Sequence, residues 1–189
     1  LSWTRELPTT TPAFISPRLQ FDAGYEPIVA KGRLLIASSR NDSVSAYDTS
    51  TGKELWVYRT NGPVRFAPAV WNESVCFGSD DGFLYCVSAT SGALQWKIRG
   101  TPESHPDYRL LINGRLCSRW PFPGAPVVFG DNVYFGSRIW PEEGVYVCAA
   151  EADTGDILWC SDSMSYVATG MSDQGREYEL SLPPLAYPA

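Results

Sequence analysis

The sequence has few residues of the kinds that build metal and haem centres. It contains one histidine, His105, and its five cysteines form no Cys-x-x-Cys pair. Zinc and haem sites draw on such clusters, so we expect no metal site. No apolar run approaches the roughly 20 residues that a membrane-spanning helix needs. The formal net charge is −6, whereas nucleic-acid-binding surfaces are basic. These absences argue against nucleic-acid partners and a membrane span.

Aromatic and turn-forming residues are abundant instead. The chain has seven tryptophans, 16 glycines and 15 prolines among 189 residues. Glycine and proline spread along a chain with 44% hydrophobic residues indicate many short strands separated by tight turns. The sequence therefore predicts an all-β fold.

One hairpin pattern occurs three times and organises the chain. An apolar strand leads into a turn closed by a glycine, and a tryptophan follows four residues later: Gly52 with Trp56, Gly92 with Trp96, and Gly155 with Trp159. Trp56 and Trp96 lie 40 residues apart, which suits a four-stranded propeller blade. We predict one partial β-propeller domain over residues 1–189, with antiparallel repeats at 27–59, 68–99 and 126–160. Residues 100–125 are an insertion, and partial blades lie at both ends.

Each recurring residue has a structural reason. A glycine at the turn adopts positive φ without strain. A tryptophan can cover the edge of a neighbouring blade and donate its indole N–H to a backbone carbonyl. We predict this docking role for Trp3, Trp56, Trp96 and Trp159, with sugar stacking as the alternative.

The repeat resembles the tryptophan-docking motif of the pyrroloquinoline quinone (PQQ)-type β-propeller superfamily. The matching residues are Tyr47-Asp48, Thr51-Gly52 and Trp56, then Leu84-Tyr85, Ser91-Gly92 and Trp96, then Asp153-Thr154-Gly155 and Trp159. The strings 66–70 and 78–82 are similar to non-catalytic repeat proteins of planctomycete-type bacteria. The superfamily's dehydrogenases carry a vicinal cysteine disulfide, an Asp-x-Asp calcium segment and, in some, a haem motif, none of which is present. We therefore expect no cofactor, with PQQ and calcium as the alternative.

A candidate ligand site lies at the loops that enter the innermost strands. These loops and one longer hairpin loop bring arginines, tryptophans and acidic residues toward one funnel, which suits an anionic, flat or sugar-like ligand. The alternative is that the arginines pair with acidic residues and the tryptophans pack the insertion. The residues are Asp22, Tyr25, Glu26, Arg65, Arg119, Trp120, Arg138 and Trp140.

The cysteines and the paired acids have open interpretations. The hairpin loop 79–82, with Gly82 at positive φ, places Cys76 opposite Cys86. The two form either a disulfide or a pair of buried thiols. Asp80 and Asp81 on the turn are expected to be solvated.

The repeats thus predict architecture more firmly than function. We expect a non-catalytic scaffold or interaction module rather than an enzyme, located in the periplasm, at the cell surface or outside the cell. The alternatives are a fragment of a PQQ-dependent oxidoreductase and a carbohydrate-binding module. Open flanks of a part-propeller must be covered by further blades, a protein partner or a second copy. Because Leu1 begins no signal-peptide pattern, we expect a mature or excised piece.

Overall fold

A computed structural model describes residues 3–10, 12, 24–137, 145–161, 168–171 and 177–180. All regular structure in these residues is β. The strands are β1 (Ile28–Ala30), β2 (Arg33–Ser38), β3 (Ser43–Asp48), β4 (Glu54–Arg59), β5 (Ala69–Trp71), β6 (Ser74–Gly78), β7 (Phe83–Ser88), β8 (Leu94–Arg99), β9 (Arg109–Ile112), β10 (Arg115–Ser118), β11 (Val127–Phe129), β12 (Asn132–Ser137), β13 (Tyr146–Glu151), β14 (Ile157–Ser161), β15 (Ala168–Met171) and β16 (Glu177–Leu180).

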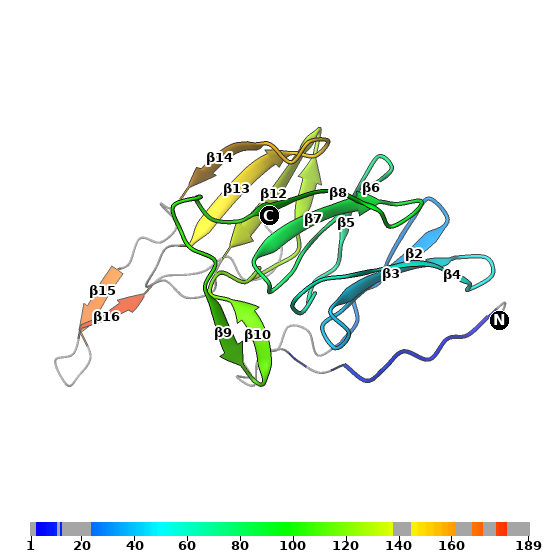
Figure 1. Cartoon of the computed structure of the whole chain (residues 1–189), viewed down its shortest axis with the longest axis horizontal. Coiled ribbons are helices and arrows are strands. Elements are labelled where there is room, and N and C mark those ends of the chain that lie inside the picture. Colours follow the sequence, from blue (N-terminus) through cyan, green and yellow to red (C-terminus); the bar gives the residue numbers. More distant parts are fainter. Residues whose placement is uncertain are drawn as a thin grey trace.

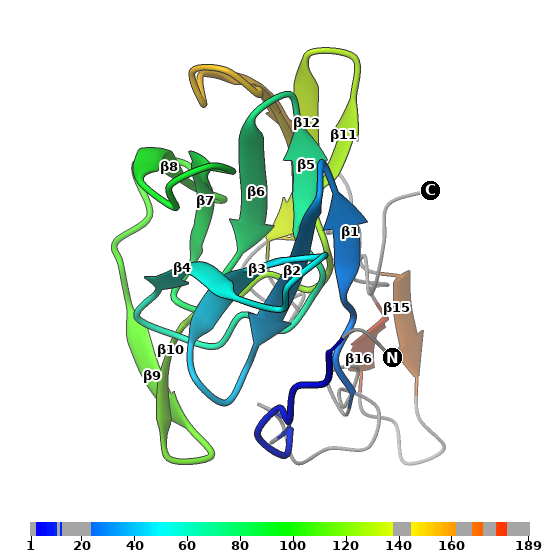
Figure 2. The ribbon, with the colours of Figure 1, turned by 90° about the vertical axis from the view of Figure 1, so that its right-hand side faces the viewer.

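Three four-stranded antiparallel sheets form the body of the molecule (Figure 1). We name them blade 1 (β1–β4), blade 2 (β5–β8) and blade 3 (β11–β14). Within each sheet the strands follow chain order. Figure 2 shows the first strands β1, β5 and β11 on the same side of the blades, and β11 contacts β5. This arrangement confirms the predicted all-β propeller fragment. No helix within the described part of the chain has the length and apolarity to cross a membrane.

Two apolar clusters fill the spaces between the blades. The first joins blades 1 and 2 through Leu35, Val44, Phe77 and Tyr85. The second joins blades 2 and 3 through Leu84, Phe135 and other buried side chains. Apolar burial of this kind is the main favourable term in folding. Blade 2 therefore shares one cluster with blade 1 and the other with blade 3.

Tryptophans of successive repeats pack onto the glycine turn of the next blade. The indole N–H of Trp56 donates to the carbonyl of Ala89 at 2.8 Å, and that of Trp96 donates to Ala152 at 3.2 Å. Trp3 makes the corresponding bond to Thr49 at 2.9 Å. The rings lie against Gly52, Gly92 and Gly155, where an added Cβ would come within 2.6–2.8 Å of the indole. All three glycines have positive φ.

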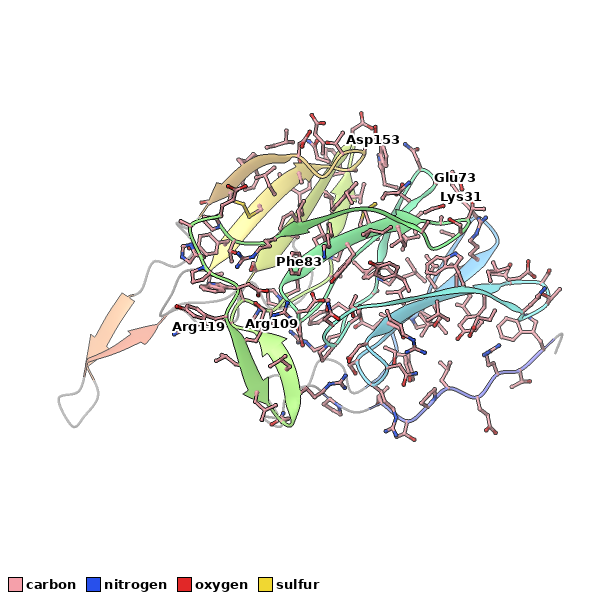
Figure 3. All side chains as sticks on the ribbon, viewed as in Figure 1. Lys31, Glu73, Phe83, Arg109, Arg119 and Asp153 are labelled. Atoms are coloured by element: carbon pink, nitrogen blue, oxygen red, sulfur yellow. A yellow bond between two sulfur atoms is a disulfide. The ribbon has the colours of Figure 1, made fainter. Side chains whose placement is uncertain are left out.

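Exposed contacts supplement these docked rings. Lys31 on blade 1 and Glu73 on blade 2 form an ion pair at 2.7 Å, and Figure 3 shows them side by side. Both side chains are about half exposed, so the pair contributes at most about 1 kcal/mol.

The insertion forms a hairpin of its own, β9–β10, which projects from the blades in Figure 1. Ile112 lies opposite Arg115, and the connecting residues Asn113 and Gly114 both have positive φ, as the Asn-Gly turn predicts. Arg115 reaches back to blade 1, where it donates to the Ser39 carbonyl and pairs with Asp42. The insertion is therefore tied to blade 1, although all of blade 2 lies between them in the sequence.

A disulfide joins the last two strands of blade 3. Cys148 on β13 lies directly opposite Cys160 on β14, and the two are bonded. We did not predict this pair from the sequence. Its signal is the repeat itself: Trp159 lies opposite Ala149 as Trp96 lies opposite Cys86, so the next pair in register is Cys148 and Cys160.

Reduction of this disulfide is expected to destabilise blade 3. A cross-link with a sequence separation of 12 stabilises a fold by about 3 kcal/mol, mainly by restricting the unfolded chain. We expect a dithiol reductant to lower the urea midpoint of the wild-type chain. A C148A/C160A variant should show the lower midpoint from the outset and no response to the reductant; a response in that variant would assign the effect to other cysteines.

Asp48 organises the first docking turn and gives it a pH dependence. Its Oδ1 accepts hydrogen bonds from the hydroxyls of Ser50 and Thr51 at 2.6 and 2.8 Å, and from their backbone N–H groups. These bonds lower the pKa of Asp48 from 3.8 to about 2. A carboxylate whose pKa is lowered by folding stabilises the native state above its unfolded pKa, and this contribution is lost as the pH falls through the folded value.

We therefore expect Asp48→Asn to remove part of the acid sensitivity. The wild type should exceed the variant in stability at neutral pH, and the difference should shrink between about pH 4 and pH 2. Urea unfolding of both proteins across this range measures the effect. An unchanged difference would contradict the assignment to Asp48.

Candidate functional site

The crossover loops between blades meet at one end of blade 2, around Arg65. The whole residue is 5% exposed. Its Nε lies 2.7 Å from an Asp80 carboxylate oxygen, and a terminal nitrogen donates to the Phe122 carbonyl at 2.6 Å. Asp80 belongs to the β6–β7 turn, and Phe122 belongs to the loop that enters blade 3. One guanidinium thus holds both crossover loops to the same turn.

The two acids of that turn are buried, so the expectation that they are solvated is wrong. Asp80 is 1% exposed and Asp81 is fully buried. Asp81 accepts hydrogen bonds from the Tyr85 hydroxyl at 2.6 Å and from the backbone N–H of Asn61 at 3.0 Å. Burial and the adjacent Asp81 carboxylate raise the pKa of Tyr85, so Tyr85 stays protonated and acts as a donor. The predicted left-handed Gly82 is confirmed, with φ of 90°.

Trp120 and Arg119 lie where the insertion returns to the blades. Trp120 is 3% exposed and packs in the second cluster, with the His105 ring edge-on at 5.3 Å. The Nε2 of His105 lies 3.2 Å from the Tyr146 hydroxyl on blade 3. The Arg119 backbone N–H donates to Tyr108, and Figure 3 shows Arg119 near Arg109. Arg65 and Trp120 are thus both buried.

Two further members of the predicted funnel, Tyr25 and Glu26, contact backbone atoms of other loops. Tyr25 donates its hydroxyl to the Pro8 carbonyl at 2.7 Å. A Glu26 carboxylate oxygen lies 3.4 Å from the Ala67 backbone nitrogen. Asp22, Arg138 and Trp140 lie outside the described residues. A ligand role for this set stays a prediction.

Cys76 and Cys86 lie opposite each other as the hairpin register predicts, and both are thiols in the structure. Their sulfurs are 3.2 Å apart and fully buried. The mutual hydrogen bond, followed by burial, raises the pKa of the Cys76 thiol. Cys76 and Cys86 are therefore not disulfide-bonded; the structure has a disulfide between Cys148 and Cys160. Cys117 is a third buried thiol, whose pKa burial raises to about 12.

No cation site is formed by the side chains that the structure describes. Among them no three histidine, cysteine, aspartate or glutamate residues come together in a way that could hold a metal ion. Asp80 is paired with Arg65, and the partners of Asp81 are hydrogen-bond donors. The polar side chains at this end of blade 2, Arg65, Asp80 and Asp81, thus form a buried hydrogen-bonded network with a structural role.

The fold and this serial docking of blades define a propeller of the quinoprotein type. The quinohemoprotein alcohol dehydrogenase of Comamonas testosteroni is a similar solved structure, with a TM-score of 0.57 and 27% identity over 73% of this chain and 21% of that one. The computationally designed Ika4 protein has the same fold, with a TM-score of 0.55 and 11% identity over 94% of this chain and 99% of its own.

Sequence comparison gives the family. The family model described as "Outer membrane protein assembly factor BamB" matches residues 1–178. The chain belongs to the PQQ-like β-propeller repeat family. A relative in Gluconacetobacter polyoxogenes, "Alcohol dehydrogenase (quinone), dehydrogenase subunit", is 31% identical over 146 residues, 70% of this chain. The quinohemoprotein alcohol dehydrogenase of Comamonas testosteroni is 32% identical over 159 residues, 76% of this chain. The chain spans about a fifth of the length of these relatives.

These relatives overturn one expectation. The absence of the cysteine pair and of the calcium and haem motifs led us to expect no cofactor. The relatives are named as quinone and quinohemoprotein enzymes, so the expectation of a cofactor-free protein is wrong. The absence of these motifs from the chain is misleading, because the chain corresponds to only about a fifth of the length of each relative.

Proposed function

We propose that this chain supplies consecutive blades to the propeller of a quinoprotein alcohol dehydrogenase, an enzyme that oxidises alcohols with a bound quinone. The observation that carries the proposal is the 31–32% identity, over 146 to 159 residues, to enzymes of this name. It replaces the non-catalytic scaffold as the leading interpretation. The disulfide between Cys148 and Cys160 suits an oxidising compartment such as the periplasm.

The described residues do not fit a cofactor site by themselves. Calcium needs six to eight oxygen ligands, and no cluster of carboxylates among these residues could begin such a shell. We therefore assign them no cofactor ligand and no catalytic step. Their role is positional: Arg65 and the turn 79–82 fix the crossover loops, and these loops set how the innermost strands enter the propeller.

The free flank of blade 3 supports a larger propeller. Trp159 is 47% exposed, and its indole N–H has no hydrogen-bond partner among the residues that the structure describes. Trp56 and Trp96, its counterparts, are 7% and 9% exposed because the next blade covers them. We infer that a further blade covers Trp159 in the complete protein.

A second candidate function is a non-catalytic assembly scaffold. The family model that spans residues 1–178 carries the description of an outer membrane protein assembly factor. Under this interpretation the apolar blade flank would receive a protein partner.

Reconstitution of the protein encoded by the natural gene distinguishes the two functions. We expect this protein, reconstituted with PQQ and calcium, to reduce an artificial electron acceptor in the presence of a primary alcohol, and to bind PQQ in calorimetry. Omission of PQQ should abolish the activity. A folded full-length protein that binds no PQQ would overturn the enzyme proposal and leave the scaffold role.

A further inference from the structure

The space between blades 1 and 2 is closed at its outer rim by an aromatic ring. Tyr58 extends from β4 and lies opposite Val44 in the sheet. Its ring centroid is 5.9 Å from Phe77 and 5.6 Å from Tyr85 on blade 2. Aromatic rings at such separations pack edge-to-face or tilted. Three rings therefore fill this rim.

The same positions between blades 2 and 3 carry smaller side chains. Ile98 follows Trp96 by two residues, as Tyr58 follows Trp56. Cys148 lies opposite Phe135, as Tyr85 lies opposite Phe77. Two of the three rings are thus replaced by an isoleucine and a half-cystine.

Phe122 fills the buried inner part of the space between blades 2 and 3. Its ring stacks on Phe135 at 5.7 Å and is 1% exposed. It also lies against Gly78, where an added Cβ would come within 2.4 Å of the ring. At the position that Tyr58 has in blade 1, blade 2 carries Ile98.

A hollow of about 390 Å³ marks this place. We call it the rim hollow; it is lined by Lys97, Ile98, Arg99, Thr101, Glu103 and Ile157. Its volume lies within the range of small-molecule sites. The wall is anchored, because Arg99 donates to the carbonyls of His105 and Pro106 at 2.7 and 3.3 Å.

The lining combines two isoleucines with a threonine, two cationic side chains and one carboxylate. Ile98 on β8 and Ile157 on β14 supply its apolar part. Glu103 forms no ion pair with any described residue, and the Lys97 ammonium lies over the Phe83 ring at 4.9 Å. The Thr101 hydroxyl is buried and lacks a partner within the described residues. The hollow therefore offers an apolar floor beside an unpaired carboxylate.

We propose that the rim hollow binds arylalkylamines. The aromatic ring takes the place that Tyr58 has between blades 1 and 2 and packs on Ile98 and Ile157. The ammonium group pairs with the Glu103 carboxylate. The hollow shares no lining residue with the Arg65–Asp80 network, and the proposal does not depend on a quinone enzyme.

Calorimetric titration of the chain with tyramine tests the proposal. We expect saturable binding, and binding at least about tenfold weaker for 4-hydroxyphenylacetate, which has the same ring and the opposite charge. Glu103→Gln should weaken tyramine binding by about tenfold, since one charge-assisted hydrogen bond is worth about that much. It should leave the binding of the uncharged p-cresol unchanged. No saturable binding of tyramine by the folded chain would overturn the proposal.

A second variant tests the place of the ring. Ile98→Tyr introduces the residue that blade 1 has at the corresponding position, Tyr58, and its ring should fill the hollow. Tyramine binding should then be lost, whereas the melting temperature should be unchanged or higher. Val29→Tyr, at a position that is 68% exposed and outside the hollow, is the matched control and should bind tyramine like the wild type. Tyramine binding by Ile98→Tyr at wild-type affinity would place the ligand elsewhere and contradict the proposal.

Discussion

Replacing Asp80 with alanine is expected to lower the free energy of unfolding by about 3–5 kcal/mol, because it leaves the buried Arg65 guanidinium without its counterion. Both side chains are 1% exposed, and the nitrogen and oxygen are 2.7 Å apart. Bulk water cannot compensate for the missing carboxylate at such a site. Urea unfolding of the chain, followed by tryptophan fluorescence, measures the loss.

The exposed ion pair of Lys31 and Glu73 is the matched control. It has the same 2.7 Å separation but side chains that are 47% and 62% exposed. Lys31→Ala should therefore cost less than about 1 kcal/mol. Equal costs for Asp80→Ala and Lys31→Ala would contradict the burial of the Arg65–Asp80 pair.

A double variant separates the charge from its role in packing. Buried ion pairs are often replaceable by apolar residues of similar size, because both desolvation penalties disappear together. Arg65→Met with Asp80→Leu should thus recover part of the stability that Asp80→Ala loses. The recovery will be incomplete, because the hydrogen bond from Arg65 to the Phe122 carbonyl is lost as well.

This network shows where sequence reasoning reaches its limit. Ser79-Asp80-Asp81-Gly82 looks like an exposed polar turn, and its glycine was predicted correctly because a local φ requirement fixes it. The burial of the two acids has a non-local cause. Phe122 and Ser118, from the insertion some 40 residues later, cover the turn, and Ser118 donates to the Asp80 carbonyl at 2.6 Å. No local sequence pattern indicates that a distant segment buries this turn.

The cysteines illustrate a second limit. The Cys76–Cys86 register follows from a three-residue hairpin loop and was predictable. The Cys148–Cys160 register depends on an irregularity between Ala149 and Ala150, which recurs in all three blades beside the docking tryptophan. Counting residues across the turn without that bulge gives the wrong partners. Alignment of the three repeats on their tryptophans gives the right ones.

The docking residues form the part of the fold that sequence describes best, and they carry the second large prediction. Trp56→Ala is expected to cost about 3–5 kcal/mol, since it removes a large side chain that is 7% exposed between two blades. It also leaves the Ala89 carbonyl without the indole donor at 2.8 Å. Trp159→Ala, at the corresponding position of blade 3, is the control: Trp159 is 47% exposed, so its removal should cost far less.

Gly92→Ala approaches the same contact from the other side. The added Cβ would lie 2.8 Å from the Trp56 ring, at a residue with φ of 71°, so we expect a loss of about 3 kcal/mol from overlap and backbone strain together. Gly130→Ala isolates the strain, because Gly130 has φ of 61° and nothing within 4 Å of the added atom; it should cost about 1 kcal/mol.

A double-mutant cycle then tests the docking itself. In the Trp56→Ala background the overlap is absent, so Gly92→Ala should cost only the strain term, close to the value for Gly130→Ala. The difference between the two backgrounds is the coupling between ring and turn, and contacting residues typically couple by about 0.5–3 kcal/mol. A Gly92→Ala cost that is identical in both backgrounds would mean that the turn needs glycine for its own conformation alone. The repeated pairing of glycine and tryptophan would then mark two independent requirements of a blade rather than one contact between blades.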